Sequence, residues 1–281
     1  MKIYKTINEF VAWRKNIIAE SIGFVPTMGA LHQGHLSLVR SSKQNNVITV
    51  VSIFVNQLQF SPDEDFKNYP RDVNKDLNLL EKEGVDVVLL PTHTELYGIN
   101  YGFTVSENVL SKKLEGKSRP NFFNGVCTVV CKLFNIVLPT QSFFGMKDIQ
   151  QLIIIKKLVK DLNFNVEIVS CETVRENNGL AMSSRNQYLN DLEKDKASQL
   201  YHCLKQAKTM VENKKNYSTI IKDFKINIEK IQEMRVDYIS IANINTLDEF
   251  NDHEDIKKTD VVISSAVFFK NVRLIDNIVI L

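Results

Sequence analysis

Two histidines three residues apart, His32 and His35, form the most distinctive chemical pattern in this chain of 281 residues. They follow an apolar run over residues 22–25, and the apolar spacing after His35 is typical of a helix. We therefore predict a strand that ends, turns and enters a helix whose first turn carries both imidazoles. Unpaired backbone N–H groups and the positive end of the helix dipole suit an anion there. Gly29 and Gly34 would let a phosphate approach the backbone closely.

The His-x-Gly-His spacing of residues 32–35 is typical of enzymes that form adenylates or transfer nucleotidyl groups. Two alternatives stay open: a structural pair that caps the helix or packs in the core, and a metal site. The sequence has no further His/Cys cluster of zinc spacing that would support a metal. A second phosphate-type motif far downstream favours the phosphate interpretation.

That second motif is the segment Gly179-Leu-Ala-Met-Ser-Ser-Arg-Asn186. The hydroxyls of Ser183 and Ser184 and the planar guanidinium of Arg185 can grip a polyphosphate in succession. The alternative is a turn that is merely rich in small polar residues. The motif falls at a predicted domain junction, where ligand clefts tend to form.

Two further groups of polar residues follow predicted strands. Lys147 can neutralise a phosphate and Asp148 can accept from a ribose hydroxyl, unless both are ordinary surface charges of a first helical turn. Asn56 and Gln59 carry amides that both donate and accept, which suits hydroxyls or a carboxylate, and Gln151 can join them. A plain polar loop is the alternative for each amide.

The elements that must position these residues alternate between strands and helices. Apolar runs predict strands over residues 21–25, 47–54, 85–90, 141–144 and 166–169. Predicted helices lie over residues 34–44, 69–83, 125–138 and 147–161, and a capping box at residues 6–9 begins another. This order predicts an α/β protein with a doubly wound parallel sheet. A Gly-x-Gly-x-x-Gly dinucleotide fingerprint is absent from the sequence.

The pattern changes after about residue 185. Two helices are predicted over residues 191–211 and 217–234, followed by strands over 236–241, 261–268 and 272–280. Together these form a smaller C-terminal α+β unit. The boundary lies near residues 175–185, and we set the two domains as residues 1–176 and 177–281.

Composition excludes several classes of partner. The 35 Lys and Arg against 33 Asp and Glu give a net charge of +2, which is too balanced to indicate nucleic acid. Residues 1–20 lack the apolar core of a signal peptide, and no run approaches the ~20 apolar residues of a membrane span. We therefore expect a cytoplasmic protein with no membrane partner. The four cysteines lie in apolar surroundings and are expected to be buried thiols.

Six segments, in this order, resemble the pantothenate synthetase (pantoate–β-alanine ligase) family over nearly the whole chain. Single motifs recur in other families that transfer adenylyl groups, whereas the ordered set is specific. The segments are Pro26-Thr-Met-Gly-Ala-Leu-His-Gln-Gly-His35, Phe54-Val-Asn-Gln-Leu-Gln-Phe60, Tyr69-Pro-Arg71, Leu114-Glu-Gly-Lys-Ser-Arg-Pro120, Phe144-Gly-Met-Lys-Asp-Ile-Gln-Gln151 and Met182-Ser-Ser-Arg-Asn186.

The resemblance implies a fold and a reaction. The N-terminal domain would be Rossmann-like, the C-terminal domain a lid over its cleft, and the protein a homodimer. ATP and (R)-pantoate would form pantoyl adenylate and pyrophosphate with the help of Mg²⁺. β-Alanine would then displace AMP to give pantothenate.

The resemblance also implies roles for residues. His35, His32 and Lys147 would be the catalytic residues: the two histidines would stabilise charge at the α-phosphate, and Lys147 would hold phosphate. Gly145 and Asp148 would hold the ribose, and adenine would meet backbone groups of Val174 and Met182. Metal ligands are unassigned, with Asp76 a weak candidate. The ATP-binding residues would be Met28, Gly29, Ala30, Leu31, His32, Gln33, Gly34, His35, Gly145, Met146, Lys147, Asp148, Val174, Met182, Ser183, Ser184 and Arg185. Pantoate and β-alanine would be bound by Pro26, Thr27, Asn56, Gln59 and Gln151.

The chain departs from the family pattern at three positions. Gln57 replaces a usual proline, Gly98 replaces another, and Phe122 stands where a histidine usually follows the Arg-Pro-x element. We expect Phe122 to pack against Phe123 or a neighbour while Arg119 makes any polar contact. Two rival functions remain: a shorter nucleotidyltransferase that shares His-x-Gly-His, and a regulator that binds ATP without turnover.

Overall fold

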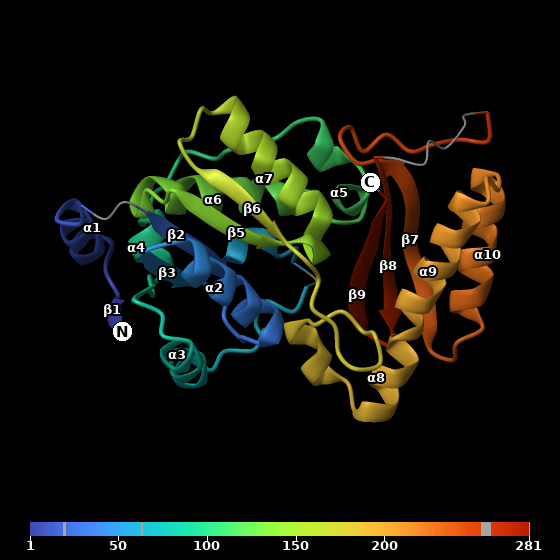
Figure 1. Cartoon of the computed structure of the whole chain (residues 1–281), viewed down its shortest axis with the longest axis horizontal. Helices are drawn as coiled ribbons and strands as arrows, with labels where there is room; N and C mark the ends of the chain where they lie inside the picture. The colour runs from blue at the N-terminus through green and yellow to red at the C-terminus, as the bar shows by residue number, and fades with distance from the viewer. Residues whose placement is uncertain (19–20, 63, 254–259, 281) are drawn as a thin grey trace.

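The computed structural model describes residues 1–18, 21–62, 64–253 and 260–280. Within these ranges the chain forms a parallel sheet of six strands and an antiparallel sheet of three strands (Figure 1). Helices flank both sheets. The predicted fold class, a doubly wound α/β architecture with a smaller α+β unit, is confirmed.

The large sheet has its topological switch at its centre. Its strand order is β1-β4-β3-β2-β5-β6, so the chain moves outward from β2 to β3 and β4 and then returns to the other side of β2 with β5. Loops that leave β2 and β5 at their carboxyl ends therefore diverge there, and ligands bind at such points in open α/β sheets. The strands are β1 (Lys2–Tyr4), β2 (Ile22–Thr27), β3 (Ile48–Ile53), β4 (Val87–Leu89), β5 (Gln141–Gly145) and β6 (Glu167–Cys171).

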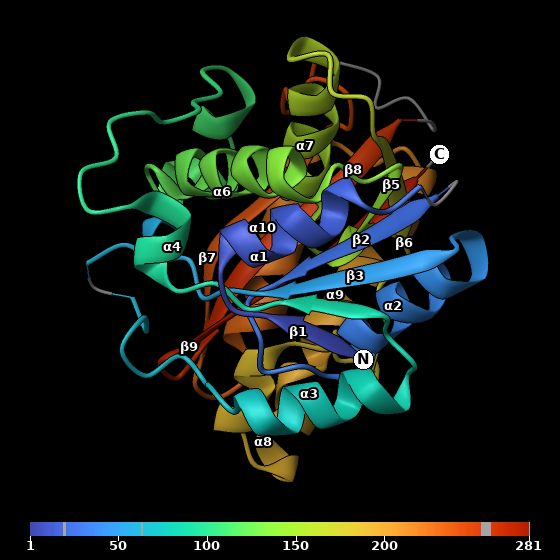
Figure 2. The same ribbon diagram turned by 90° about the vertical axis from the view of Figure 1, so that its left-hand side faces the viewer.

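Alternate residues of the central strands serve opposite faces of the large sheet. Phe24 and Val50 belong to one apolar core with α1, α6 and α7, whereas Val25 and Val51 belong to another with α2 and α3 (Figure 2). Both faces are covered, which explains the near-continuous apolar runs in the sequence. The helices of this part are α1 (Ile7–Lys15), α2 (Gln33–Asn45), α3 (Val73–Lys82), α4 (His93–Tyr97), α5 (Glu115–Ser118), α6 (Phe122–Val137) and α7 (Ile149–Asp161).

The C-terminal unit has a core of its own, built where α9 and α10 pack on the antiparallel sheet β7-β8-β9. Its elements are α8 (Asp191–Ala197), α9 (Gln199–Glu212), α10 (Tyr217–Glu229), β7 (Met234–Asn243), β8 (Val261–Phe269) and β9 (Val272–Ile280). Separate cores agree with two domains, and the boundary after residue 176 stays a prediction.

Most predicted elements appear within a few residues of their expected ends. Three differences have local causes. The helix predicted from residue 69 begins at Val73, because the Asp72 side chain accepts from the Lys75 N–H and caps it there. The helix predicted over 191–211 is two helices that meet at Ser198. Strand β1 was not predicted, since three residues at a sheet edge give no readable period.

Four short 3₁₀ turns complete the framework. They are η1 (Gln57–Gln59), η2 (Leu110–Lys112), η3 (Met146–Asp148) and η4 (Ser184–Tyr188). Three of them carry predicted site residues. In the described part of the chain, no helix is both long enough and apolar enough to cross a membrane.

Candidate active site

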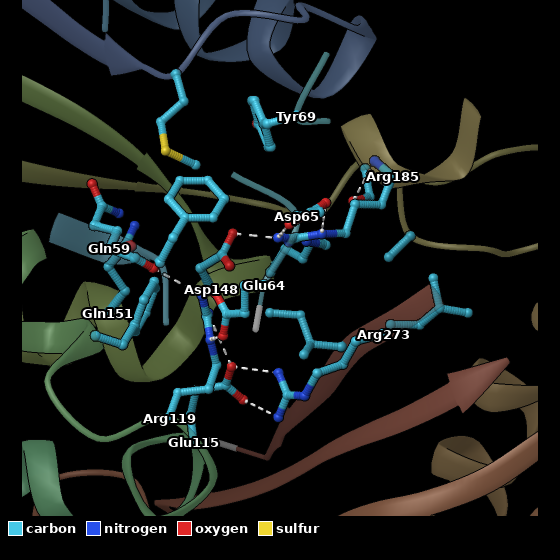
Figure 3. Close-up of a pocket in the computed structure, with 18 of the residues that line it drawn as sticks. Gln59, Glu64, Asp65, Tyr69, Glu115, Arg119, Asp148, Gln151, Arg185 and Arg273 are labelled. Atoms are coloured by element: carbon cyan, nitrogen blue, oxygen red, sulfur yellow. Dashed lines mark hydrogen bonds and ion pairs between the residues drawn. The ribbon is translucent and has the colours of Figure 1, made fainter. Parts of the chain in front are cut away.

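A cavity of about 790 Å³ lies at the carboxyl edge of the large sheet and is closed on its far side by residues of η4, α9 and β9 (Figure 3). Because β2 and β5 are parallel neighbours, the turns that follow them leave from the same edge. The predicted site residues that line this cavity are Pro26, Thr27, Met28, His35, Gln59, Lys147, Asp148, Gln151, Ser183 and Arg185.

The turn from Met28 to His35, here called the histidine turn, brings the two imidazoles together with ring centroids 4.1 Å apart. His32 is the N-cap of α2: its Nδ1 accepts from the Gly34 N–H at 3.1 Å. His35 Nδ1 accepts from the His32 N–H at 3.3 Å. Since each Nδ1 is an acceptor, each neutral ring carries its proton on Nε2. The turn therefore presents two Nε2–H donors.

Both histidines are held neutral. Burial, followed by the Lys147 cation, lowers the pKa of His32 to about 4, against an opposing effect of Asp148. Burial, the neighbouring His32 and Lys147 lower the pKa of His35 well below its usual range. The structure therefore favours imidazoles that act as neutral donors rather than as cations.

Asp76 fixes the histidine turn from the side of α3. Its carboxylate accepts from the Ala30 N–H at 2.9 Å and from the Leu31 N–H at 2.8 Å. Gly29 has φ +79°, and a Cβ there would lie 2.9 Å from the Asp76 carboxylate. Burial raises the pKa of Asp76, against the effect of these two hydrogen bonds. Both carboxylate oxygens thus serve the backbone, which gives the suggested metal ligand a structural role.

The expectation of unpaired backbone N–H groups at the histidine turn needs correction at several positions, where these groups already have partners. The N–H groups of Ala30 and Leu31 donate to Asp76, and that of Gly34 donates to His32. Gly34 is needed because a Cβ there would lie 2.9 Å from the His32 ring, so an imidazole makes the close approach predicted for a phosphate. The donors that remain on the imidazoles are their Nε2–H groups, and of the two residues His35 lines the cavity.

Residues 145–148, at the end of β5, supply another side of the cavity. Gly145 ends β5, Met146 begins η3, and Lys147 and Asp148 line the cavity. The Lys147 ammonium lies 3.9 Å from the Asp148 carboxylate. Since this ammonium depresses the pKa of both histidines, its charge acts in the same space as the two imidazoles.

The Gly179–Asn186 motif contacts the histidine turn through a hydrogen bond. The Ser184 hydroxyl donates to the Ala30 carbonyl at 3.0 Å. Ser183 caps η4 by accepting from the Arg185 N–H, and the Met182 N–H donates to the Val174 carbonyl at 3.0 Å. Two motifs more than a hundred residues apart in sequence thus share one site.

Arg185 is already paired. Its guanidinium donates to both carboxylate oxygens of Asp65, at 2.7 and 3.0 Å (Figure 3). Burial opposes ionisation of Asp65, but the hydrogen bond and charge of Arg185 outweigh it and lower the pKa of that carboxyl. An anionic ligand that recruits Arg185 must therefore displace Asp65.

The amides predicted to bind substrate divide into two groups. Gln59 and Gln151 line the cavity (Figure 3). Asn56 lies behind them and is 1% exposed: its Nδ2 donates to Gln59 Oε1 at 2.9 Å, and its Oδ1 accepts from the Tyr97 hydroxyl at 2.9 Å. The prediction that Asn56 contacts substrate is therefore corrected, because its polar atoms are committed to orienting Gln59.

A set of ion-paired side chains, here called the charged wall, also faces the cavity: Glu64, Asp65, Glu115, Arg119, Arg185 and Arg273. The sequence indicated Arg119 and Arg185 but not Arg273 or any of the carboxylate partners. Arg119 donates to both oxygens of Glu64, each at 2.6 Å, and to the Gln59 carbonyl at 3.0 Å. Arg273 on β9 donates to both oxygens of Glu115, at 2.5 and 2.9 Å. No sequence spacing links these partners, so only the fold reveals them.

Phe122 behaves as the sequence predicted. It lines the cavity, its ring meets that of Phe123 with centroids 4.9 Å apart, and the Arg119 guanidinium carbon lies 3.8 Å from its ring centroid. A cation–π contact of this kind stabilises the placement of Arg119. Packing for Phe122 and polar contacts for Arg119 are both confirmed.

Comparison with known proteins finds relatives over the full length of the chain. A family model described as pantoate-beta-alanine ligase matches residues 2–279. The pantothenate synthetase of Thermosipho melanesiensis is 46% identical over 284 residues, covering 100% of this chain and 99% of that protein.

Two solved structures share the whole architecture. The crystal structure of pantothenate synthetase from Thermus thermophilus has a TM-score of 0.92 at 38% identity and covers 100% of this chain and 99% of its own. Pantoate-beta-alanine ligase from Francisella tularensis, complexed with beta-gamma ATP and beta-alanine, has a TM-score of 0.82 at 34% identity and covers 99% and 97%. Full-length similarity of this kind favours the ligase over the shorter nucleotidyltransferase.

Proposed function

The chain belongs to the pantoate–β-alanine ligase family, and on that premise we propose how its cavity performs the reaction. ATP activates (R)-pantoate as pantoyl adenylate with release of pyrophosphate. The amine of β-alanine then attacks the acyl carbon, and AMP leaves. A carboxylate is a poor electrophile, and the mixed anhydride supplies the leaving group that the amide-forming step needs.

The pair of neutral imidazoles carries this proposal. Their Nε2–H groups stabilise the negative charge that develops on the α-phosphate while pantoate attacks it. His35 lines the cavity and is the catalytic residue, with His32 assisting. Neutral donors fixed before the reaction require no reorganisation when the charge develops.

The nucleotide lies along the edge where the phosphate motifs converge. Lys147, Ser183, Ser184 and Arg185 hold the phosphates, and Arg185 exchanges its Asp65 partner for a phosphate oxygen. Gly145 and Asp148 bind the ribose, and backbone groups near Val174 and Met182 meet adenine. The complex of the Francisella relative with beta-gamma ATP and beta-alanine supports the binding of these two ligands, and their placement here is our proposal.

Pantoate lies on the other side of the histidine turn, between Gln59 and Gln151. Both amides line the cavity, and Asn56 orients the first of them. Pro26 and Thr27 form the floor where β2 ends. The carbonyl of Gln59 is itself held by Arg119, so the charged wall helps to set the position of this substrate.

We also propose that Mg²⁺ accompanies the nucleotide. Among the described residues, no cluster of three or more His, Cys, Asp or Glu side chains could cage a metal. Mg²⁺ commonly keeps several waters and binds largely through substrate phosphates, so a Mg²⁺ that arrives with the nucleotide does not require a cage of protein ligands.

A homodimer and a cytoplasmic location complete the proposal. Ile99 and Phe103 are 88% and 93% exposed, and Val109, further along the same segment of the chain, is also exposed, so a second copy has apolar side chains to cover. Light scattering should give twice the mass of the chain. All four cysteines are free thiols, which suits a reducing compartment.

The test is an assay of AMP and pyrophosphate with ATP, pantoate and β-alanine. We expect both products in equal amounts, together with pantothenate, and no turnover when pantoate is omitted. Pyrophosphate without AMP would indicate a nucleotidyltransferase instead. Binding of ATP without either product would indicate a regulator.

A further inference from the structure

One residue of the C-terminal sheet makes hydrogen bonds to the backbone of η3, the turn that carries Lys147. Asn277 on β9 is 6% exposed, and its Nδ2 donates to the Met146 carbonyl at 2.9 Å and to the Lys147 carbonyl at 2.8 Å. A primary amide has two N–H groups. Asn277 therefore uses its full donor capacity on the backbone of η3.

Asp276, the residue before Asn277, is linked to the other phosphate motif, the Gly179–Asn186 segment. Asp276 is 3% exposed and accepts from both terminal nitrogens of Arg175, at 2.6 and 2.9 Å. Arg175 also donates to the Gly179 carbonyl, at the start of the Gly179–Asn186 segment, and its guanidinium carbon lies 3.5 Å from the Tyr201 ring centroid. Two successive residues of β9 thus contact both phosphate-binding segments.

A hydrogen bond also links Asn277 to Asp276. The Asn277 N–H donates to Asp276 Oδ1 at 2.8 Å, so the oxygen that receives Arg175 also fixes the backbone of Asn277. Buried hydrogen bonds of this type have no competing water and hold their partners in one geometry. The path from Gly179 to Lys147 is continuous.

We propose that Asn277 is a positioning residue for the adenylation step: it holds the η3 turn so that the Lys147 ammonium faces the phosphates. This inference rests on the proposed role of Lys147. The C-terminal domain then has a function beyond covering the cleft, since it sets the geometry of a lysine carried by the other sheet. Small displacements of a charged group in an active site cost up to about 100-fold in rate.

The experiment compares Asn277→Ala with Ser265→Ala in the full chain. Ser265 lies opposite Asp276 in the β8–β9 pairing and donates to the Tyr238 carbonyl at 2.9 Å, so its loss also removes one part-buried hydrogen bond from the same sheet. We expect Asn277→Ala to lower kcat/KM for ATP by roughly 10- to 100-fold. Ser265→Ala should stay within about twofold at a similar loss of thermal stability.

A double-mutant cycle with Lys147→Ala separates positioning from general stability. If Asn277 acts through Lys147, Asn277→Ala should have little further effect in the Lys147→Ala background. An equal factor in both backgrounds, or equal effects of the Asn277 and Ser265 variants, would overturn the inference. Asn277→Ser keeps one side-chain donor, so its kcat/KM for ATP should lie between the values of wild type and Asn277→Ala. This variant is used in place of Asn277→Ala if the alanine variant unfolds.

The same cycle tests the underlying proposal separately. Lys147→Ala at the wild-type rate would overturn the phosphate role of Lys147 in the proposed function. Loss of activity in Lys147→Ala with additive effects of Asn277→Ala would leave that role intact and reject only the positioning by Asn277.

Discussion

The histidine turn and the charged wall face the same cavity but are built in opposite ways. The histidine turn is uncharged where it meets the cavity, and its conformation is fixed by hydrogen bonds to its own backbone and to Asp76. The charged wall consists of guanidinium groups that are already paired with carboxylates, as Arg185 is with Asp65 and Arg119 with Glu64.

The difference indicates two kinds of contribution. Donors that are fixed in advance favour the transition state, because no group has to move when charge develops. A paired guanidinium must first leave its carboxylate, so its contribution to binding is reduced by the free energy of that pair. We therefore expect changes in the histidine turn to affect the rate, and changes in the charged wall to affect binding.

The largest effect should come from His35→Ala. Loss of one such donor typically costs about 10²–10³ in rate. Single-turnover formation of pantoyl adenylate should fall by this factor, while ATP affinity measured by calorimetry stays close to wild type. His202→Ala, at an exposed histidine on α9, is the matched control and should be neutral. Adenylation by His35→Ala at the wild-type rate would remove the residue from the mechanism.

Arg185 and Asp65 should have opposite effects on binding. Arg185→Ala should raise KM for ATP by about 10- to 100-fold, because a hydrogen bond to a charged group is worth about 1.5–3 kcal/mol. Asp65→Asn should instead lower KM a few fold, because it weakens the partner that ATP must displace. Asp161→Asn, which breaks an exposed ion pair with Lys157 on α7, is the control. If Asp65→Asn weakens ATP binding as Arg185→Ala does, the pair acts as a unit and the exchange model is wrong.

The neutral histidines predict how stability depends on pH. The folded-state pKa of His32 is about 4, below the ordinary 6.5, so the unfolded chain takes up a proton first as the pH falls. The contribution of His32 to stability is therefore complete above pH 6.5 and lost between 6.5 and about 4, at up to about 1.4 kcal/mol per pH unit. His32→Asn keeps an N-cap acceptor without this titration.

Chemical denaturation at pH 7 and pH 5 measures this effect. The free energy of unfolding of wild type should fall more between the two values than that of His32→Asn. Parallel changes in both proteins would mean that His32 is not held neutral in the fold.

The smallest effect should follow from Phe122→His. Phe122 contributes apolar contacts with Phe123 and a ring face for Arg119, and its side chain has no proton to transfer. The turnover number should stay near wild type while the melting temperature changes. A large gain in turnover, with a new titration near the histidine pKa of ~6.5, would instead show that a catalytic group had been restored.

Local signals and long-range contacts differ in how far the sequence reveals them. The ends of β2 and β5 were predictable from apolar runs that stop at turns, and with them the placement of the histidine turn and Lys147 at one edge. The partners of the histidine turn could not be predicted, because Asp76 lies more than forty residues from Ala30 and is brought close to it by α3. The same holds for Asn277, whose bonds to η3 depend on how two separate sheets pack.

The central claim is that the histidine turn forms an adenylate of pantoate before the amine is needed. Exchange of labelled pyrophosphate into ATP, measured without β-alanine, tests it most directly. We expect exchange that depends on pantoate alone. Exchange that appears only when β-alanine is present, or that proceeds without pantoate, would contradict it.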